Sequence, residues 1–167
     1  ELTRDEHEHI KLAATEKLHE FVELSPTSKV LLEIIKDAVG DKCAVAVRFA
    51  VDELLGPKGI TCESEGREVV EMLAEIPDLW DVNISGWEND SVTSRFEKEG
   101  YQETYINFVK SLTTKPVVGV GRYTSPDKMV ELINKNHLDL IGAARPSIAD
   151  PFLPLKISEG RLEDIRE

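Results

Sequence analysis

The 167-residue chain lacks a long apolar run, a surplus of basic residues and an apparent secretion signal. No apolar segment approaches the ~20 residues of a membrane-spanning helix, so we expect no membrane association. No basic segment precedes an apolar stretch at the start, which predicts no signal peptide. The net charge of -12 disfavours nucleic acid as a partner, because its phosphates attract lysine and arginine.

Cysteine and histidine show no metal-binding pattern. The two cysteines, Cys43 and Cys62, do not have the spacing of a metal site, and we expect Cys43 to be a small core residue of an apolar strand. Low cysteine content favours a reducing compartment and predicts the cytoplasm. We predict no metal site, since no ligand spacing relates the four histidines: His7, His9, His19 and His137.

Apolar and amphipathic segments alternate along the rest of the sequence. Short apolar runs predict strands at 43–50, 79–85, 116–121 and 138–144. Amphipathic patterns predict a helix at the start, a helical tail at 151–167, and helices at 30–42, 67–76, 101–112 and 125–136. Ser125 and Pro126 suit the N-cap and first position of the last of these.

This alternation predicts an α/β fold with parallel strands and right-handed crossovers. Four strand–helix units are half of a (β/α)8 TIM barrel. A doubly wound sheet would normally have a glycine-rich turn after its first strand, and none follows residues 45–50, so we favour the half-barrel. We treat 1–167 as one partial-barrel domain, in which 1–29 form a helix and a shortened loop, 30–154 the βα units and 155–167 the tail.

Two of the expected strands end in small-residue turns that carry an arginine. These turns are Gly121-Arg122 and Ala144-Arg145. Backbone N–H groups of such a turn point outward, and the guanidinium adds positive charge. On successive strands of a parallel barrel, two such turns form the phosphate site expected after strands seven and eight. The alternative is a pair of tight turns with surface arginines.

Four motifs carry a resemblance to a known family: DAVGDKCAVAVRF, WDVNISGWENDSVTSRF, KPVVGVGRYTSPDKM and DLIGAARPSIADPFLP. The sequence resembles the old-yellow-enzyme family of FMN-dependent barrels, in the branch of the trimethylamine, dimethylamine and histamine dehydrogenases. The resemblance covers about 32–166 and implies strands five to eight of the barrel. It implies FMN as cofactor and, in a complete barrel, oxidation of an amine or reduction of an enone.

The resemblance also implies roles for individual residues. Arg48 would lie beside N1 and O2 of the flavin and stabilise negative charge there, with a strand-end salt bridge as the alternative. The two arginine turns would bind the FMN phosphate. Trp87 would form part of an aromatic bowl for an alkylammonium substrate, with ordinary packing as the alternative. Asp90 would orient a catalytic pair, and Trp80 is expected in the core.

The sequence departs from the family pattern in four places. The strand that carries a His-x-x-His, His-x-x-Asn or Tyr-x-x-His pair is missing before residues 18–21, and a loop is missing after Pro26. Either the protein lacks these two segments, or the sequence joins residues that are not consecutive in the protein. The cysteines that bind the family's four-iron cluster would follow Glu167, and the first half of the barrel is absent. We therefore expect little turnover from the chain alone.

A half-barrel exposes two edge strands and an inner sheet face, on which we expect apolar side chains. Such surfaces favour association, so we predict a homo-oligomer. The alternative function is a non-catalytic half-barrel that binds a phosphate ligand or assembles with itself.

Overall fold

The computed structural model describes residues 26–86, 89 and 95–166. The chain divides into two compact units, Glu1–Val45 and Ala46–Glu167. The helix expected at the start, together with His7, His9 and His19, lies outside the described residues.

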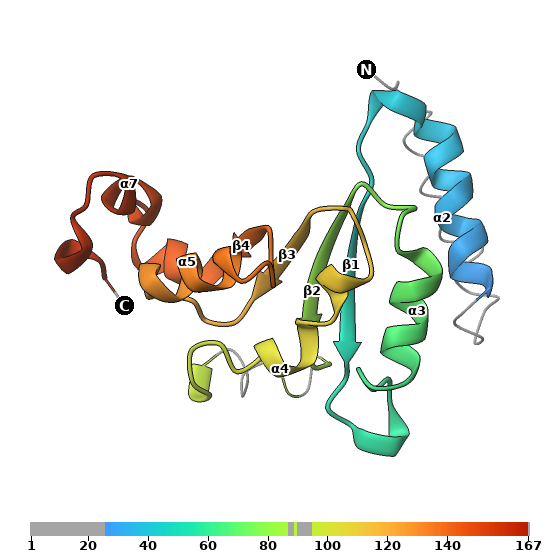
Figure 1. The fold of residues 1–167 in the computed structure, drawn as a ribbon, viewed down its shortest axis with the longest axis horizontal. Helices are drawn as coiled ribbons and strands as arrows, with labels where there is room; N and C mark the ends of the chain where they lie inside the picture. The colour runs from blue at the N-terminus through green and yellow to red at the C-terminus, as the bar shows by residue number, and fades with distance from the viewer. Residues whose placement is uncertain (1–25, 87–88, 90–94, 167) are drawn as a thin grey trace. The chain divides into compact units, whose positions relative to one another are not determined.

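In the first unit the described part is one helix and a short 3-10 turn. Helix α2 spans Pro26–Val39, and η1 spans Gly40–Lys42 (Figure 1). Gly40 has a φ of 53°, a left-handed conformation that glycine adopts without strain, which explains why the α-helix ends before it. Cys43 is exposed and precedes the first strand, so the prediction of a core cysteine is wrong.

The second unit is built on four parallel strands. They are β1 (Ala46–Asp52), β2 (Leu79–Ile84), β3 (Val117–Val120) and β4 (Leu140–Gly142). Their order in the sheet is β1-β2-β3-β4, the same as in the sequence. Right-handed crossovers that all advance in one direction place their helices on one face of the sheet. This arrangement confirms the half-barrel, because a doubly wound sheet has its first strand in the interior.

Helices connect the strands (Figure 1). After β1 come η2 (Gly56–Lys58) and α3 (Glu65–Leu73), and after β3 comes α5 (Pro126–Asn134). Ser125 caps α5 as predicted, since its Oγ accepts a hydrogen bond from the Lys128 amide at 3.4 Å. The helix expected at 101–112 is divided into α4 (Glu103–Ile106) and η4 (Val109–Ser111).

The chain beyond β4 differs most from the prediction. The last strand ends at Gly142, and the tail consists of α6 (Ala144–Ala149), α7 (Leu153–Ser158) and η5 (Leu162–Asp164). A buried ion pair holds the tail together, with Lys156 Nζ 2.6 Å from Asp150 Oδ2. The hydrogen bond from Lys156 lowers the pKa of Asp150, so this carboxylate remains charged at neutral pH.

The two faces of the sheet have different chemistry. Trp80, Val82 and Ile84 of β2 are fully buried on the face against which α4 packs. Asp81 and Asn83 alternate with them and point to the other side, which we call the inner face. The register pairs Arg48 with Asp81 there, so the middle of the inner face is polar, although we expected apolar side chains.

Candidate anion-binding site

A cavity of about 290 Å³ lies on the inner face, at the ends of β2, β3 and β4. All five residues predicted to bind the cofactor line it: Arg48, Gly121, Arg122, Ala144 and Arg145. The remaining described lining is Asn83, Gln102, Val120, Gly142 and Pro146. The fold therefore brings together predicted residues as far apart in the sequence as Arg48 and Arg145, which are 97 positions apart.

A buried tyrosine packs against the turn that follows β3. A Cβ on Gly121 would lie 2.8 Å from Cζ of Tyr123, so only glycine fits there. Tyr123 is fully buried, and its burial raises the pKa of its hydroxyl, which stays protonated. Arg122 has a φ of 57°, a conformation that costs energy for a residue with a Cβ. The close packing holds this backbone in place.

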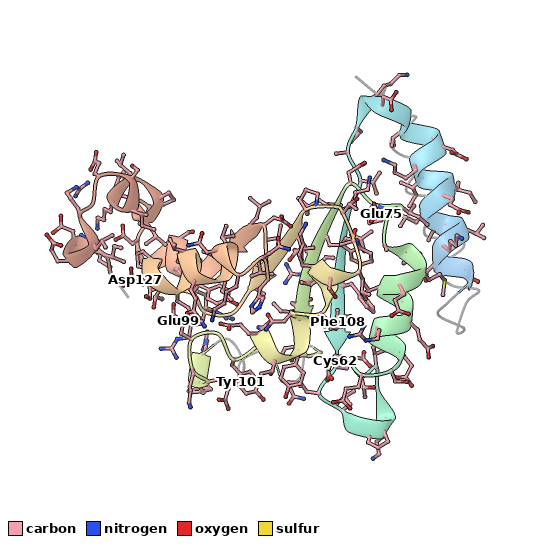
Figure 2. All side chains as sticks on the ribbon, viewed as in Figure 1. Cys62, Glu75, Glu99, Tyr101, Phe108 and Asp127 are labelled. Carbon is pink, nitrogen blue, oxygen red and sulfur yellow. The ribbon has the colours of Figure 1, made fainter. Side chains whose placement is uncertain are left out.

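The segment that follows this turn is attached to the chain before α4. Arg122 donates through Nη1 to the carbonyl oxygen of Glu97 at 2.8 Å. The amides of Thr124 and Ser125 both donate to Oε1 of Glu99, which Figure 2 labels, at 2.8 Å. The Gly100 amide donates to the carbonyl oxygen of Gly121. These bonds position the β3 turn before any ligand binds.

The turn after β4 is built differently from the prediction. Ala144 and Arg145 do not form a turn at the end of the strand. They are the first two residues of α6, whose N-cap is Ala143. A Cβ on Gly142 would lie 2.6 Å from Cγ1 of Val120, so glycine is needed for the close packing of β4 beside β3. The side chain of Arg145 is exposed beside the cavity. Arg145 therefore lies beside the cavity, but it belongs to a helix and not to the end of a strand.

Arg48 lies within β1 rather than at its end. Its Nη1 is 3.1 Å from Oδ2 of Asp81, and 64% of its side chain is exposed. The ion pair that we considered as the alternative role is therefore present. It orients the guanidinium along the inner face, and the same residue lines the cavity.

The cavity has a positive lining in an acidic chain. Three of its described lining residues are arginines and none is acidic, whereas the whole chain has a net charge of -12. Guanidinium groups are suited to phosphate and carboxylate. The arrangement can bind an anion, and it holds no nucleophile or metal ligand set among the residues that the structure describes.

The two other predicted site residues, Trp87 and Asp90, lie outside the described residues. Burial and the neighbouring Asp52 raise the pKa of the Cys62 thiol to about 11, so it is protonated at neutral pH and is a poor nucleophile. Sequence reasoning missed Asn83 and Gln102. Strand alternation could have found Asn83, whereas nothing in the sequence marked Gln102.

The fold defines part of a (β/α)8 barrel, with an arginine-lined cavity at the carboxyl ends of its strands. The chain belongs to the NADH:flavin oxidoreductase / NADH oxidase family, whose model matches residues 29–164. Flavin is the redox group that this family's name records. Among the helices of the described residues, none has the length and apolar character to span a bilayer.

Several relatives are similar over most of this chain. Dimethylamine dehydrogenase from Hyphomicrobium sp. (strain x) is 48% identical over 81% of the chain and 19% of its own length. The structure of 6-hydroxypseudooxynicotine amine oxidase from Pseudomonas geniculata N1 is 61% identical, with a TM-score of 0.79, over 84% of this chain and 21% of its own. The structure of histamine dehydrogenase from Rhizobium sp. 4-9 is 52% identical, with a TM-score of 0.77, over 85% of this chain and 20% of its own. The chain thus spans about a fifth of the length of these relatives.

These comparisons confirm the predicted family and its resemblance to the amine dehydrogenases. They do not favour the alternative of a non-catalytic phosphate-binding half-barrel.

Proposed function

We propose that this chain binds FMN in the arginine-lined cavity and forms part of an FMN-dependent amine oxidoreductase. The observation that carries the proposal is the convergence of Arg48, Arg122 and Arg145 on one cavity at the carboxyl end of the sheet. Parallel barrels bind ligands at this end, and phosphate sites form after the last two strands. The family, whose name records flavin, and the amine-oxidising relatives support the proposed cofactor and reaction.

The residues present fit the phosphate end of FMN. Arg122 and Arg145 supply charged donors, and Gly121 and Gly142 let the backbone of the two turns pack closely, because a Cβ there would overlap Tyr123 and Val120. Arg48 is on the inner face, where its charge would stabilise an anionic flavin ring. When bound, FMN supplies hydride or electron transfer. The chain's own residues would bind its phosphate, orient the ring and set its charge environment.

The substrate is proposed to be a small amine. Trp87 and Asp90 remain the predicted substrate-side residues, supported by the family motif between β2 and α4. The names of the relatives, which include a dimethylamine dehydrogenase and a histamine dehydrogenase, support an amine over an enone. We further propose that the protein acts in the cytoplasm.

FMN binding can be tested by titrating the 167-residue chain with FMN and with riboflavin, which has no phosphate. We expect FMN to bind at least tenfold more tightly, because one charge-assisted hydrogen bond is worth about 1.5–3 kcal/mol. Isothermal titration calorimetry measures both affinities. Equal affinities, or no binding of FMN, would contradict the proposal.

We also propose that a second copy of the chain covers the exposed inner face and the edges of the sheet. Among the described residues, β1 and β4 each pair on one side only, and Leu140 of β4 is 47% exposed. Burying about 600 Å² per chain is worth on the order of 15 kcal/mol, against an association cost of about 4–15 kcal/mol. The polar Arg48–Asp81 pair lowers that gain.

Sedimentation of the chain tests this association. One chain has a mass of 18.7 kDa, so a dimer has twice that mass, 37.4 kDa. We expect the dimer or a larger assembly at micromolar concentration. A single species of 18.7 kDa across the concentration range would exclude it.

A further inference from the structure

The arginine on the inner face is paired with a carboxylate of the neighbouring strand. Nη1 of Arg48 lies 3.1 Å from Oδ2 of Asp81, which the register of β1 and β2 places directly opposite it. Arg48 lines the cavity, whereas Asp81, 33 positions further along the chain, does not. A ligand on the inner face therefore meets an arginine whose positive charge is opposed by a carboxylate beside it.

Arg48 and Arg122, which line the same cavity, differ in what they bind. Nη1 of Arg122 donates to a neutral acceptor, the backbone carbonyl oxygen of Glu97, at 2.8 Å. Arg48 instead donates to the charged carboxylate of Asp81. This difference suits a ligand with a charged phosphate at one end and a ring of lower charge at the other.

The ion pair contributes little to the stability of the sheet. The Arg48 side chain is 64% exposed and that of Asp81 is 27% exposed, so solvent screens their attraction. The second carboxylate oxygen of Asp81, Oδ1, is buried and has no hydrogen-bond partner among the residues that the structure describes. A buried acceptor without a partner costs free energy. The charge that the pair presents on the inner face explains the carboxylate better than stability does.

The effect of Asp81 on a bound flavin depends on the charge of the ring. An oxidised flavin ring is neutral, whereas a reduced ring that has lost a proton is an anion. The charge of Asp81 opposes the attraction between Arg48 and the anion, but it has little effect on the neutral ring. Any effect of Asp81 on the orientation of Arg48 acts on both forms and cancels in the ratio of their affinities.

We propose that Asp81 offsets the charge of Arg48 and so limits how strongly the chain stabilises the anionic, reduced form of a flavin ring on the inner face. The inference rests on the proposed FMN site and deepens it, because it assigns the control of the flavin's charge to a residue that does not line the cavity. Asp81 acts through Arg48 and is a positioning residue.

Asp81→Asn tests this role, with oxidised and reduced FMN as probes at mildly alkaline pH, where the reduced ring is anionic. The substitution removes the charge and keeps an oxygen that can accept from Arg48. We expect the ratio of the affinity for reduced FMN to that for oxidised FMN to rise about three- to tenfold. Oxidised FMN should bind within about twofold of the unchanged chain. Anaerobic equilibration with a reference dye measures the ratio as an upward shift in the reduction potential of bound FMN.

Asp164→Asn is the matched control, because Asp164 pairs with an arginine at the same distance. Oδ2 of Asp164 lies 3.1 Å from Nη1 of Arg161, and neither residue lines the cavity, so the ratio should be unchanged. Arg48→Gln removes the cation and should lower the ratio, since the anionic ring then loses its attraction. A ratio that Arg48→Gln leaves unchanged would mean that the ring lies away from the pair, and would overturn the inference.

A structural role for Asp81 gives a different result. The ligand-free Asp81→Asn chain should melt within about 3 °C of the unchanged chain, because an exposed ion pair adds little stability. A lower melting temperature together with an equal loss of affinity for both forms of FMN would assign Asp81 a structural role. An unchanged or lower ratio in Asp81→Asn would also overturn the inference.

The two proposals fail in distinguishable ways. If the unchanged chain does not bind FMN, the proposed function is wrong, and the inference about Asp81 is wrong with it. If the chain binds FMN and the ratio does not respond to Asp81→Asn, the flavin site stands and only the role of Asp81 is wrong.

Discussion

Removing both guanidinium groups beside the turns, with Arg122→Ala and Arg145→Ala together, is expected to weaken FMN binding about a hundredfold. Each charge-assisted hydrogen bond to phosphate is worth about 1.5–3 kcal/mol, and 1.4 kcal/mol is a factor of ten. We take the lower end of this range because both side chains are exposed, so solvent screens their charge. Fluorescence titration with FMN measures the change.

Two controls separate loss of the phosphate contact from loss of the fold. Riboflavin has no phosphate, so its affinity should stay within about twofold in the double variant. Arg161→Ala removes an arginine that pairs with Glu159 and Asp164, away from the cavity, and should leave FMN affinity unchanged. A double variant that binds FMN as tightly as the unchanged chain would refute the arginine site.

The sequence allowed prediction of the parts of the site that depend on strand order. Successive parallel strands end at the same edge of a sheet, so the turns at Gly121 and Ala144 had to lie close together once four βα units were recognised. Placing Arg48 on the same cavity came from the family motif. The placement of the two turns, by contrast, needed only the order of the elements and an arginine at each turn.

Other features depend on packing that no local pattern encodes. Alternation along β2 separates Asp81 and Asn83 from Trp80 and Val82, but it does not say which set faces the helices. Helix α6 replaces the expected end of the last strand, because Gly142 is the last residue that pairs with β3. Gln102 follows a polar loop, and only the tertiary contact with the ends of the strands gives it a place in the cavity.

The largest stability effect is expected from Trp80→Ala. Trp80 is fully buried and lies between Val47 of β1 and Val117 of β3 in the sheet register. Its Nε1 donates to the carbonyl oxygen of Ala74 at 3.1 Å. Truncating a buried tryptophan costs about 3–5 kcal/mol, a large part of the ~5–15 kcal/mol that stabilises a typical domain. We expect the melting temperature to fall by about 10–20 °C in calorimetry.

Phe96→Ala is the matched control, since this aromatic side chain is 79% exposed and its removal should change stability by less than about 0.5 kcal/mol. The comparison also tests the two faces of the sheet. If Trp80→Ala were as mild as Phe96→Ala, Trp80 would not lie against the helices. The alternation of β2 would then be reversed, and Asp81 and Asn83 would point into the helix layer. The Arg48–Asp81 pair and the lining of the cavity both require the opposite orientation.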